Sequence, residues 1–280
     1  MGKAPRIFLR GLDPPRILVH QLTGAAMLAC ALLLCVLSFR VAPLRAETVA
    51  VRHAEGVAHG FLVLRNANGE AIAYGDMVQD TSHGLVTSRL TFHFKDGSLY
   101  DEKTTFSEQG VFRVLSDHLI EKGSSFKQPM ETWLNARTGG FKALTTDQGK
   151  DSVVSKKIKI PRDLANGIIY VVVKNVDPKA PSTTVSILVG TPKPRMVKLV
   201  IRPQGEQRFE IGELHRTALH YVIEFDLGGV AGVLAPVLGK QPAKMDIWIA
   251  SEGMPTFLMS RGQLFEDGPI WTIALTTPHW

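Results

Sequence analysis

The chain has 280 residues, and its 32 Lys and Arg against 26 Asp and Glu give a formal net charge of +6. Residues 1–46 hold six of the basic groups and one acid, so the remainder carries 26 basic and 25 acidic groups and lacks the excess positive charge typical of phosphate-backbone binding. With 45% hydrophobic and 21% charged residues, the composition is globular and excludes a disordered or collagen-like chain.

Residues 17–39 are uncharged and largely apolar, and they follow four basic residues and precede VAPLRAET. This is the layout of a secretory signal peptide, with cleavage expected after Ala46. An uncleaved anchor is the alternative, because the apolar stretch approaches the length that spans a bilayer. Either interpretation exports residues 47–280 to the periplasm or cell envelope. Since Cys30 and Cys35 both lie in the apolar stretch, the exported part has no disulfide and no thiol chemistry.

Short strand-like runs separated by turns follow over residues 48–145. Asn68-Gly69 and Asp96-Gly97 each separate two such runs, and these dipeptides are strong hairpin signals. In residues 90–94 the apolar side chains alternate with Thr and His, as in a strand with one buried face. Strands at intervals of about a dozen residues indicate an antiparallel meander.

Residues 161–178 interrupt this pattern. The segment PRDLANG and the closing Asp177-Pro178 are typical of helix ends, whereas the β-branched residues of 168–173 favour a strand. We favour the helix. Strand patterns then resume at residues 183–189, 195–202, 217–225, 245–251, 255–265 and 269–275.

Together these patterns predict a mainly β fold. We expect a curved antiparallel meander, a half-barrel or incomplete barrel with one or two short helices. Residues 47–280 form it either as one unit or as two lobes, 47–160 and 161–280.

The 13 residues from Leu227 to Gly239 carry no charge and show no strict alternation. A buried turn or short helix that plugs the core is the favoured interpretation. The alternative is an apolar lid that meets a lipid or membrane, because exposed apolar patches tend to be interaction sites.

One short pattern occurs twice. Met130-Glu-Thr-Trp133-Leu and Met245-Asp-Ile-Trp248-Ile share the form Met-acid-x-Trp-aliphatic at an offset of 115 residues. Either the two matches arose by chance in a β-rich chain or they mark a duplication.

Motifs that carry chemistry are absent from the sequence. There is no G-x-S-x-G, no H-E-x-x-H and no phosphate-binding loop, so we predict no catalytic residue, no metal and no cofactor. Asp96, Ser98, Asp101 and Glu102 lack the register of a calcium-binding loop and are interpreted as the solvated acidic rim of a hairpin. An envelope hydrolase would need convergent polar groups, such as His118 or His220 beside a carboxylate.

Aromatic residues are spread over the predicted strands of both halves. A curved sheet encloses a concave apolar face that can hold a small ligand. The predicted ligand-binding residues are Phe92, Phe94, Trp133, Phe225, Val230, Val233, Leu234 and Trp248.

The chain resembles the uncharacterised exported β-rich proteins of bacterial envelopes. The export segment, KDGSLYDEKTTFSEQGVFRVLSDHLI, PRDLANG and MDIWIASEGMPTFLMSRG carry this resemblance. More distantly, the plan is similar to half-barrel carriers of the lipoprotein-localisation type, whose curved sheet holds acyl chains. That second likeness is one of architecture alone.

These observations predict a non-catalytic envelope protein that binds a lipid or other apolar ligand in its curved sheet, with residues 227–239 as the mouth. The alternatives are a structural or assembly protein that uses an apolar surface as an interface, and an envelope hydrolase. The expected partners are the apolar ligand and an envelope protein, with no nucleic acid. Membrane contact is expected only through the N-terminal segment or residues 227–239.

Overall fold

Fourteen antiparallel strands make up one sheet in the computed structural model, which describes residues 48–147, 150–190, 194–211, 214–226 and 242–276. In chain order the strands are β1 Ala58–Arg65, β2 Ala71–Ser82, β3 Leu85–Phe94, β4 Leu99–Ser107, β5 Arg113–Lys122, β6 Met130–Asn135, β7 Gly140–Asp147, β8 Lys150–Lys157, β9 Thr183–Val189, β10 Arg195–Ile211, β11 Leu214–Asp226, β12 Met245–Ala250, β13 Phe257–Gln263 and β14 Ile270–Leu275.

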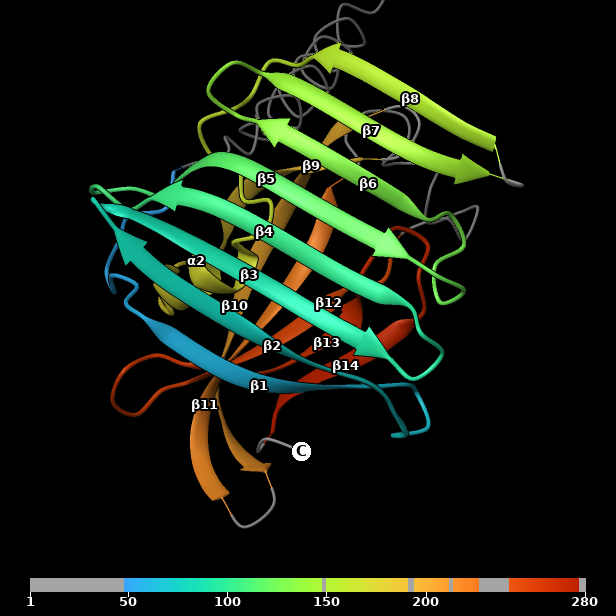
Figure 1. The fold of residues 1–280 in the computed structure, drawn as a ribbon. Coiled ribbons are helices and arrows are strands. Elements are labelled where there is room, and N and C mark those ends of the chain that lie inside the picture. Colours follow the sequence, from blue (N-terminus) through green and yellow to red (C-terminus); the bar gives the residue numbers. More distant parts are fainter. Residues whose placement is uncertain (1–47, 148–149, 191–193, 212–213, 227–241, 277–280) are drawn as a thin grey trace, which may run out of the picture. The chain divides into compact units, whose positions relative to one another are not determined.

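The strands join as two meanders that meet in the middle of the sheet. Strands β1 to β8 and strands β9 to β14 each pair with their neighbours in sequence, and β1 pairs with β14. Strands β8 and β9 therefore form the two edges, and the sheet does not close. It curves so that β2 to β6 face β10 and β12 to β14 across the interior (Figure 1). The mainly β, open and curved fold predicted from the sequence is confirmed.

Tight turns at the predicted dipeptides set the strand pairing. Gly69 and Gly97 have φ angles of 82° and 85°, a region that glycine enters without the steric cost borne by other residues. Each follows the Asn or Asp that a short hairpin prefers. The hairpins β1–β2 and β3–β4 therefore form where the sequence places them.

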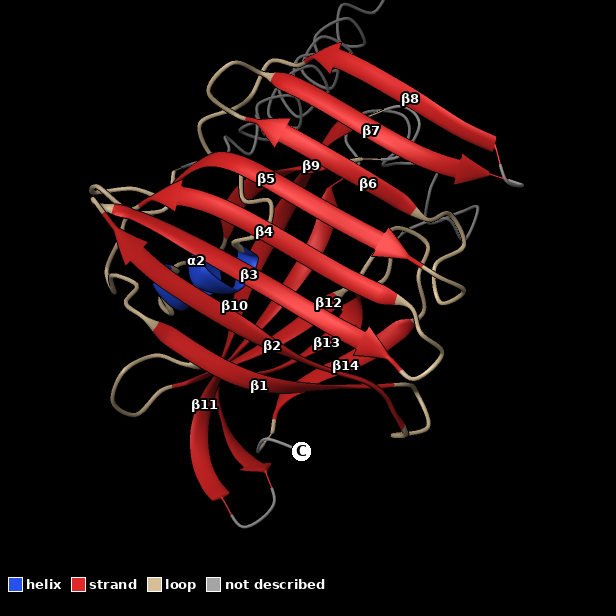
Figure 2. Ribbon diagram, in the orientation of Figure 1, coloured by secondary structure: helices blue, strands red, loops and turns tan. Residues whose placement is uncertain are grey.

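The favoured helix is also confirmed, as α2, Ile169–Asn175 (Figure 2). It has seven residues, and no side chain caps its first turn. A helix this short depends on tertiary packing for its stability, and Val171, Val172 and Val173 are all buried in the main core. In the described residues, no helix has the length and apolar character needed to cross a membrane.

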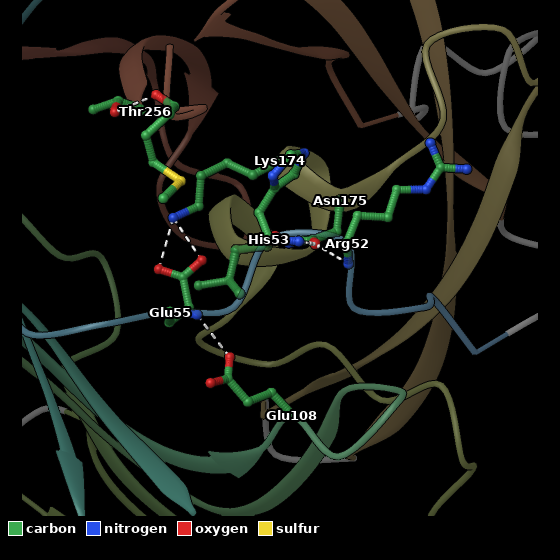
Figure 3. Close-up of polar contacts among 9 residues, drawn as sticks. Arg52, His53, Glu55, Glu108, Lys174, Asn175 and Thr256 are labelled. Carbon is green, nitrogen blue, oxygen red and sulfur yellow. Dashed lines mark hydrogen bonds and ion pairs between the residues drawn. The ribbon is translucent and has the colours of Figure 1, made fainter.

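A segment that precedes β1 fixes the other end of α2 (Figure 3). The side-chain carbonyl of Asn175 accepts hydrogen bonds from the backbone N–H groups of Arg52 and His53, both at 2.8 Å. Lys174 forms an ion pair with Glu55, with 2.6 Å between Nζ and Oε1. The helix is thus tied to residues more than 100 positions away in the sequence.

The structure contains strand segments that the sequence patterns do not predict. Strand β8 is exposed along nearly its whole length, so it lacks the alternation by which a half-buried strand is recognised. Strand β10 continues to Ile211, well beyond the expected end at residue 202, after a register shift between Pro203 and Gly205. With β11 it forms a hairpin that projects from the sheet (Figure 1).

The free side of β9 is covered by the segment 163–166. The N–H of Ala165 donates a hydrogen bond to the carbonyl of Ser186, and the N–H of Ser186 donates one to the carbonyl of Asp163. Two residues further on, the side chain of Asn166 donates to the carbonyl of Leu188 and accepts from its N–H. The outward-directed backbone groups of Ser186 and Leu188 are therefore satisfied.

Candidate functional site

A cavity of about 990 Å³ lies between the two meanders. Its walls come from β2 to β6, from residues 165–170 at the start of α2, and from β9 to β14. Most of the lining is apolar, and the side chains include Met77, Leu90, Leu119, Val197, Leu199, Phe225, Met245 and Trp271. A cavity of this size and composition is typical of small-ligand sites.

Two tyrosines and two glutamates are among the polar side chains of this lining. Tyr100 and Glu102 come from β4, Glu121 from β5 and Tyr170 from α2. Tyr100 donates a hydrogen bond from Oη to Oε2 of Glu102 at 2.9 Å, and Oη of Tyr170 lies 3.2 Å from Oγ of Ser260. On the paired strands Tyr100 stands directly opposite Glu121, so these groups form one polar region of the wall.

A second polar contact lies beside this region on the same inner face. Thr104 donates a hydrogen bond to Oδ1 of Asp117 at 2.6 Å, and both residues are buried. Gly167 packs against this pair so closely that a Cβ atom would lie 1.7 Å from Oγ1 of Thr104. With a φ of 64°, this position also favours glycine conformationally. The close contact brings the segment before α2 onto the inner face of β4 and β5.

The carboxyl groups at this end of the cavity resist ionisation. Burial raises the pKa of Glu121 to about 8. Burial also raises the pKa values of Glu102 and Asp117, and the repulsion of neighbouring carboxylates adds to the effect at Glu102. Charge in a poorly solvated site is costly unless an opposite charge compensates it. No described Lys, Arg or His forms an ion pair with any of the three.

The interpretation of this hairpin as a solvated rim is wrong for Ser98 and Asp101, which are buried, and for Glu102, which lines the cavity. Asp96 does belong to the turn, where the N–H of Ser98 holds its pKa at about 2. Asp101 is on the outer face, paired with Arg89 at 2.6 Å. Glu102 is on the inner face, because successive residues of a strand point to opposite sides. The alternation of Tyr100, Glu102, Thr104 and Phe106 is the signal that identifies this face.

The predicted ligand-binding residues occupy different places. Phe225 lines the cavity. Phe92 and Phe94 are buried in the core, where Phe94 packs against Trp271 of the cavity wall with 5.5 Å between ring centroids. Trp133 and Trp248 alternate with buried residues of β6 and β12 and do not line the cavity. The remaining three, Val230, Val233 and Leu234, lie outside the described residues, as do residues 1–46 and the rest of 227–239.

The two copies of the Met-acid-x-Trp pattern form the same arrangement in the two meanders. Trp133 stacks on His118 at 5.2 Å between centroids, and Trp248 stacks on His220 at 4.7 Å. In each case the histidine is the directly opposite residue of the preceding strand. The acid two residues before the tryptophan also contacts that histidine: Glu131 at 2.8 Å and Asp246 at 2.7 Å.

We expect this stack to stabilise each pair of strands. Aromatic pairs contribute about 0.5–1.5 kcal/mol beyond the area they bury. A double-mutant cycle of His220→Ala and Trp248→Leu, measured by chemical denaturation, should give a coupling energy in that range. The pair of His118 and Trp133 should give a smaller value, because the His118 side chain is 37% exposed and that of His220 is 13% exposed. Coupling energies near zero for both pairs would contradict a stabilising role.

Both histidines lie beside a carboxylate, as the hydrolase alternative requires. Both ring nitrogens of His220 have partners, Gln207 on one side and Asp246 on the other. Neither His118 nor His220 contacts a serine or threonine hydroxyl in the hydrogen bonds recorded for the described residues. In the part of the chain that the structure describes, no three His, Asp or Glu side chains gather in a group that could hold a metal ion.

The fold and its cavity define an open, curved antiparallel β-sheet protein with an internal ligand-sized space. No model of a known protein family matches the chain, and no curated protein matches it either. Among solved structures, the hypothetical lipoprotein YmcC from Escherichia coli (K12) is similar over 80% of this chain and 86% of its own, with 9% identity and a TM-score of 0.34. A TM-score this low lies below the level that defines a shared fold.

Proposed function

We propose that this protein is an exported, non-catalytic protein of the cell envelope that binds an amphipathic ligand in its internal cavity. The observation that carries the proposal is the cavity of about 990 Å³, whose walls are mostly apolar and are contributed by both meanders. Apolar ligands are held by the area they remove from water, and a space of this size accommodates a chain or ring system of small-molecule dimensions. The signal-like segment of residues 17–39 supports the location.

A neutral fluorescent probe tests the cavity directly. We expect the full-length protein to bind N-phenyl-1-naphthylamine saturably, with a blue-shifted emission. Leu119→Trp should reduce the affinity at least tenfold, because the larger side chain occupies the space that Leu119 borders. Native mass spectrometry and organic extraction of the purified protein then show whether a ligand is carried through purification.

Val153→Trp is the matched control, because Val153 lies on β8 and is 58% exposed. It adds the same indole far from the cavity lining and should leave probe binding unchanged. A protein that carries no ligand and fails to bind the probe contradicts the proposal. An equal loss in both variants shows that the probe binds elsewhere.

A further inference from the structure

We propose that the ligand of this cavity carries a positively charged ammonium group, held by Glu102 and Glu121 at the polar end of the apolar chamber. The inference rests on the proposed function and specifies the chemistry of its ligand. An amphiphile with a cationic head and an apolar body satisfies both parts of the lining.

The environment of Glu121 supports an ammonium ligand independently of the other acids. Its side chain lines the cavity and the residue is only 2% exposed, yet no described residue forms a hydrogen bond with its carboxyl group. A buried carboxyl group without a partner is costly. Of the three acids at this end, Glu102 has Tyr100 as its partner and Asp117 has Thr104, so Glu121 is the one that a ligand would satisfy.

The surroundings favour a cation over an anion. The charged and titratable groups that face Glu102 and Glu121 are Asp117, Tyr100 and Tyr170, and His118 acts on Asp117 from the other face of β5. The described cation of the lining, Arg195, is already paired with Glu266, and Asp267 adjoins that pair. A ligand carboxylate or phosphate would therefore meet uncompensated acids at this end.

Aromatic rings supply a second kind of contact for an ammonium group. Tyr100, Tyr170, Phe265 and Trp271 all line the same cavity, and Phe265 and Trp271 meet edge to face at 5.6 Å. Cations are attracted to the faces of such rings, more strongly where water is excluded. Carboxylates and aromatic faces together are a recognised environment for alkylated ammonium groups.

For a ligand with a permanent charge, any pH dependence of the affinity should arise from titration of the protein alone. The raised pKa of Glu121, about 8, means that this group gains its negative charge only as the pH rises through that value. A quaternary ammonium ligand should therefore bind more tightly at pH 8.5 than at pH 6. The opposite slope would contradict the assignment, because deprotonation makes any group of the lining more negative and so cannot make it repel a cation.

The test compares three amphiphiles with the same twelve-carbon chain, namely dodecyltrimethylammonium, dodecanol and dodecanoate, by isothermal titration calorimetry below their micellar concentrations. We expect the full-length protein to bind the ammonium compound at least tenfold more tightly than dodecanoate at pH 8.5. Glu121→Gln and Glu102→Gln should each remove most of that preference, while binding of dodecanol persists. Glu206→Gln, on the exposed projecting hairpin, should change nothing.

The outcomes separate this inference from the proposed function. If dodecanoate binds as tightly as the ammonium compound, or if both glutamine variants keep the preference, the ammonium assignment is overturned and the apolar cavity stands. If none of the three amphiphiles binds, the proposed function itself fails. Thermal unfolding of each variant verifies that a change in affinity does not arise from loss of the fold.

Discussion

Glu121→Gln should make the protein more stable at pH 8, by on the order of a few kcal/mol, and should leave its stability at pH 5 nearly unchanged. The wild-type pKa of Glu121 is raised by burial from its usual 4.5 to about 8. Between these values the native protein keeps a proton that the unfolded chain has released. The free energy of unfolding therefore falls as the pH rises from about 4.5 to about 8. Glutamine has a similar shape and carries no charge to desolvate.

Chemical denaturation of both proteins at pH 5, 6, 7 and 8 measures this effect. We expect the difference in unfolding free energy to widen steadily with pH. Glu206→Gln should follow the wild-type curve, because Glu206 is exposed. If Glu121→Gln also follows the wild-type curve at every pH, solvent within the cavity must hydrate the carboxylate fully.

Lys174→Met should lower the free energy of unfolding by about 3–5 kcal/mol, the range typical of breaking a buried ion pair. Lys174 and Glu55 have side chains that are only 15% and 5% exposed. Removing the cation leaves Glu55 buried beside Glu108, which already accepts a hydrogen bond from the N–H of Glu55 at 2.8 Å (Figure 3). The variant thus retains a buried charge without its partner.

Two further variants distinguish the loss of the pair from other effects. Adding Glu55→Gln to Lys174→Met should recover a large part of the lost stability, because it removes the uncompensated charge. Asp177→Asn removes the nearby ion pair with Arg52, whose side chains are 44% and 42% exposed, and should cost less than about 1 kcal/mol. Equal effects of Lys174→Met and Asp177→Asn would contradict the role of burial.

The hairpins and the helix could be predicted because their signals are local. A turn such as Asn68-Gly69 or Asp96-Gly97 fixes a strand pair within a few residues, and Asp177-Pro178 marks the end of α2. The pairing of β1 with β14 joins residues more than 200 positions apart. No periodicity within either strand identifies such a partner.

The position of Glu102 on the inner face could be predicted from the sequence, but the long-range ion pair between Lys174 and Glu55 could not. Period-two alternation places Glu102 on the same face as Tyr100 and Phe106. The assumption that a charged side chain is solvent-exposed favoured the rim interpretation over this alternation. The ion pair of Lys174 with Glu55 spans 119 residues. Its existence depends on how the segment before β1 crosses α2, which only the folded chain determines.

The hydrogen bonds of residues 163–166 along β9 also affect how copies of the protein meet at high concentration. An uncovered edge strand is a template on which another chain can add a strand, and such growth leads to aggregates. The segment 163–166 already occupies that template at β9. At the other edge, β8 carries Lys150, Lys156 and Lys157, all exposed. Lysines on an edge strand disfavour pairing with an edge strand of another molecule. A sheet that stays open to hold a cavity thereby has one edge covered by its own chain and the other protected by charge.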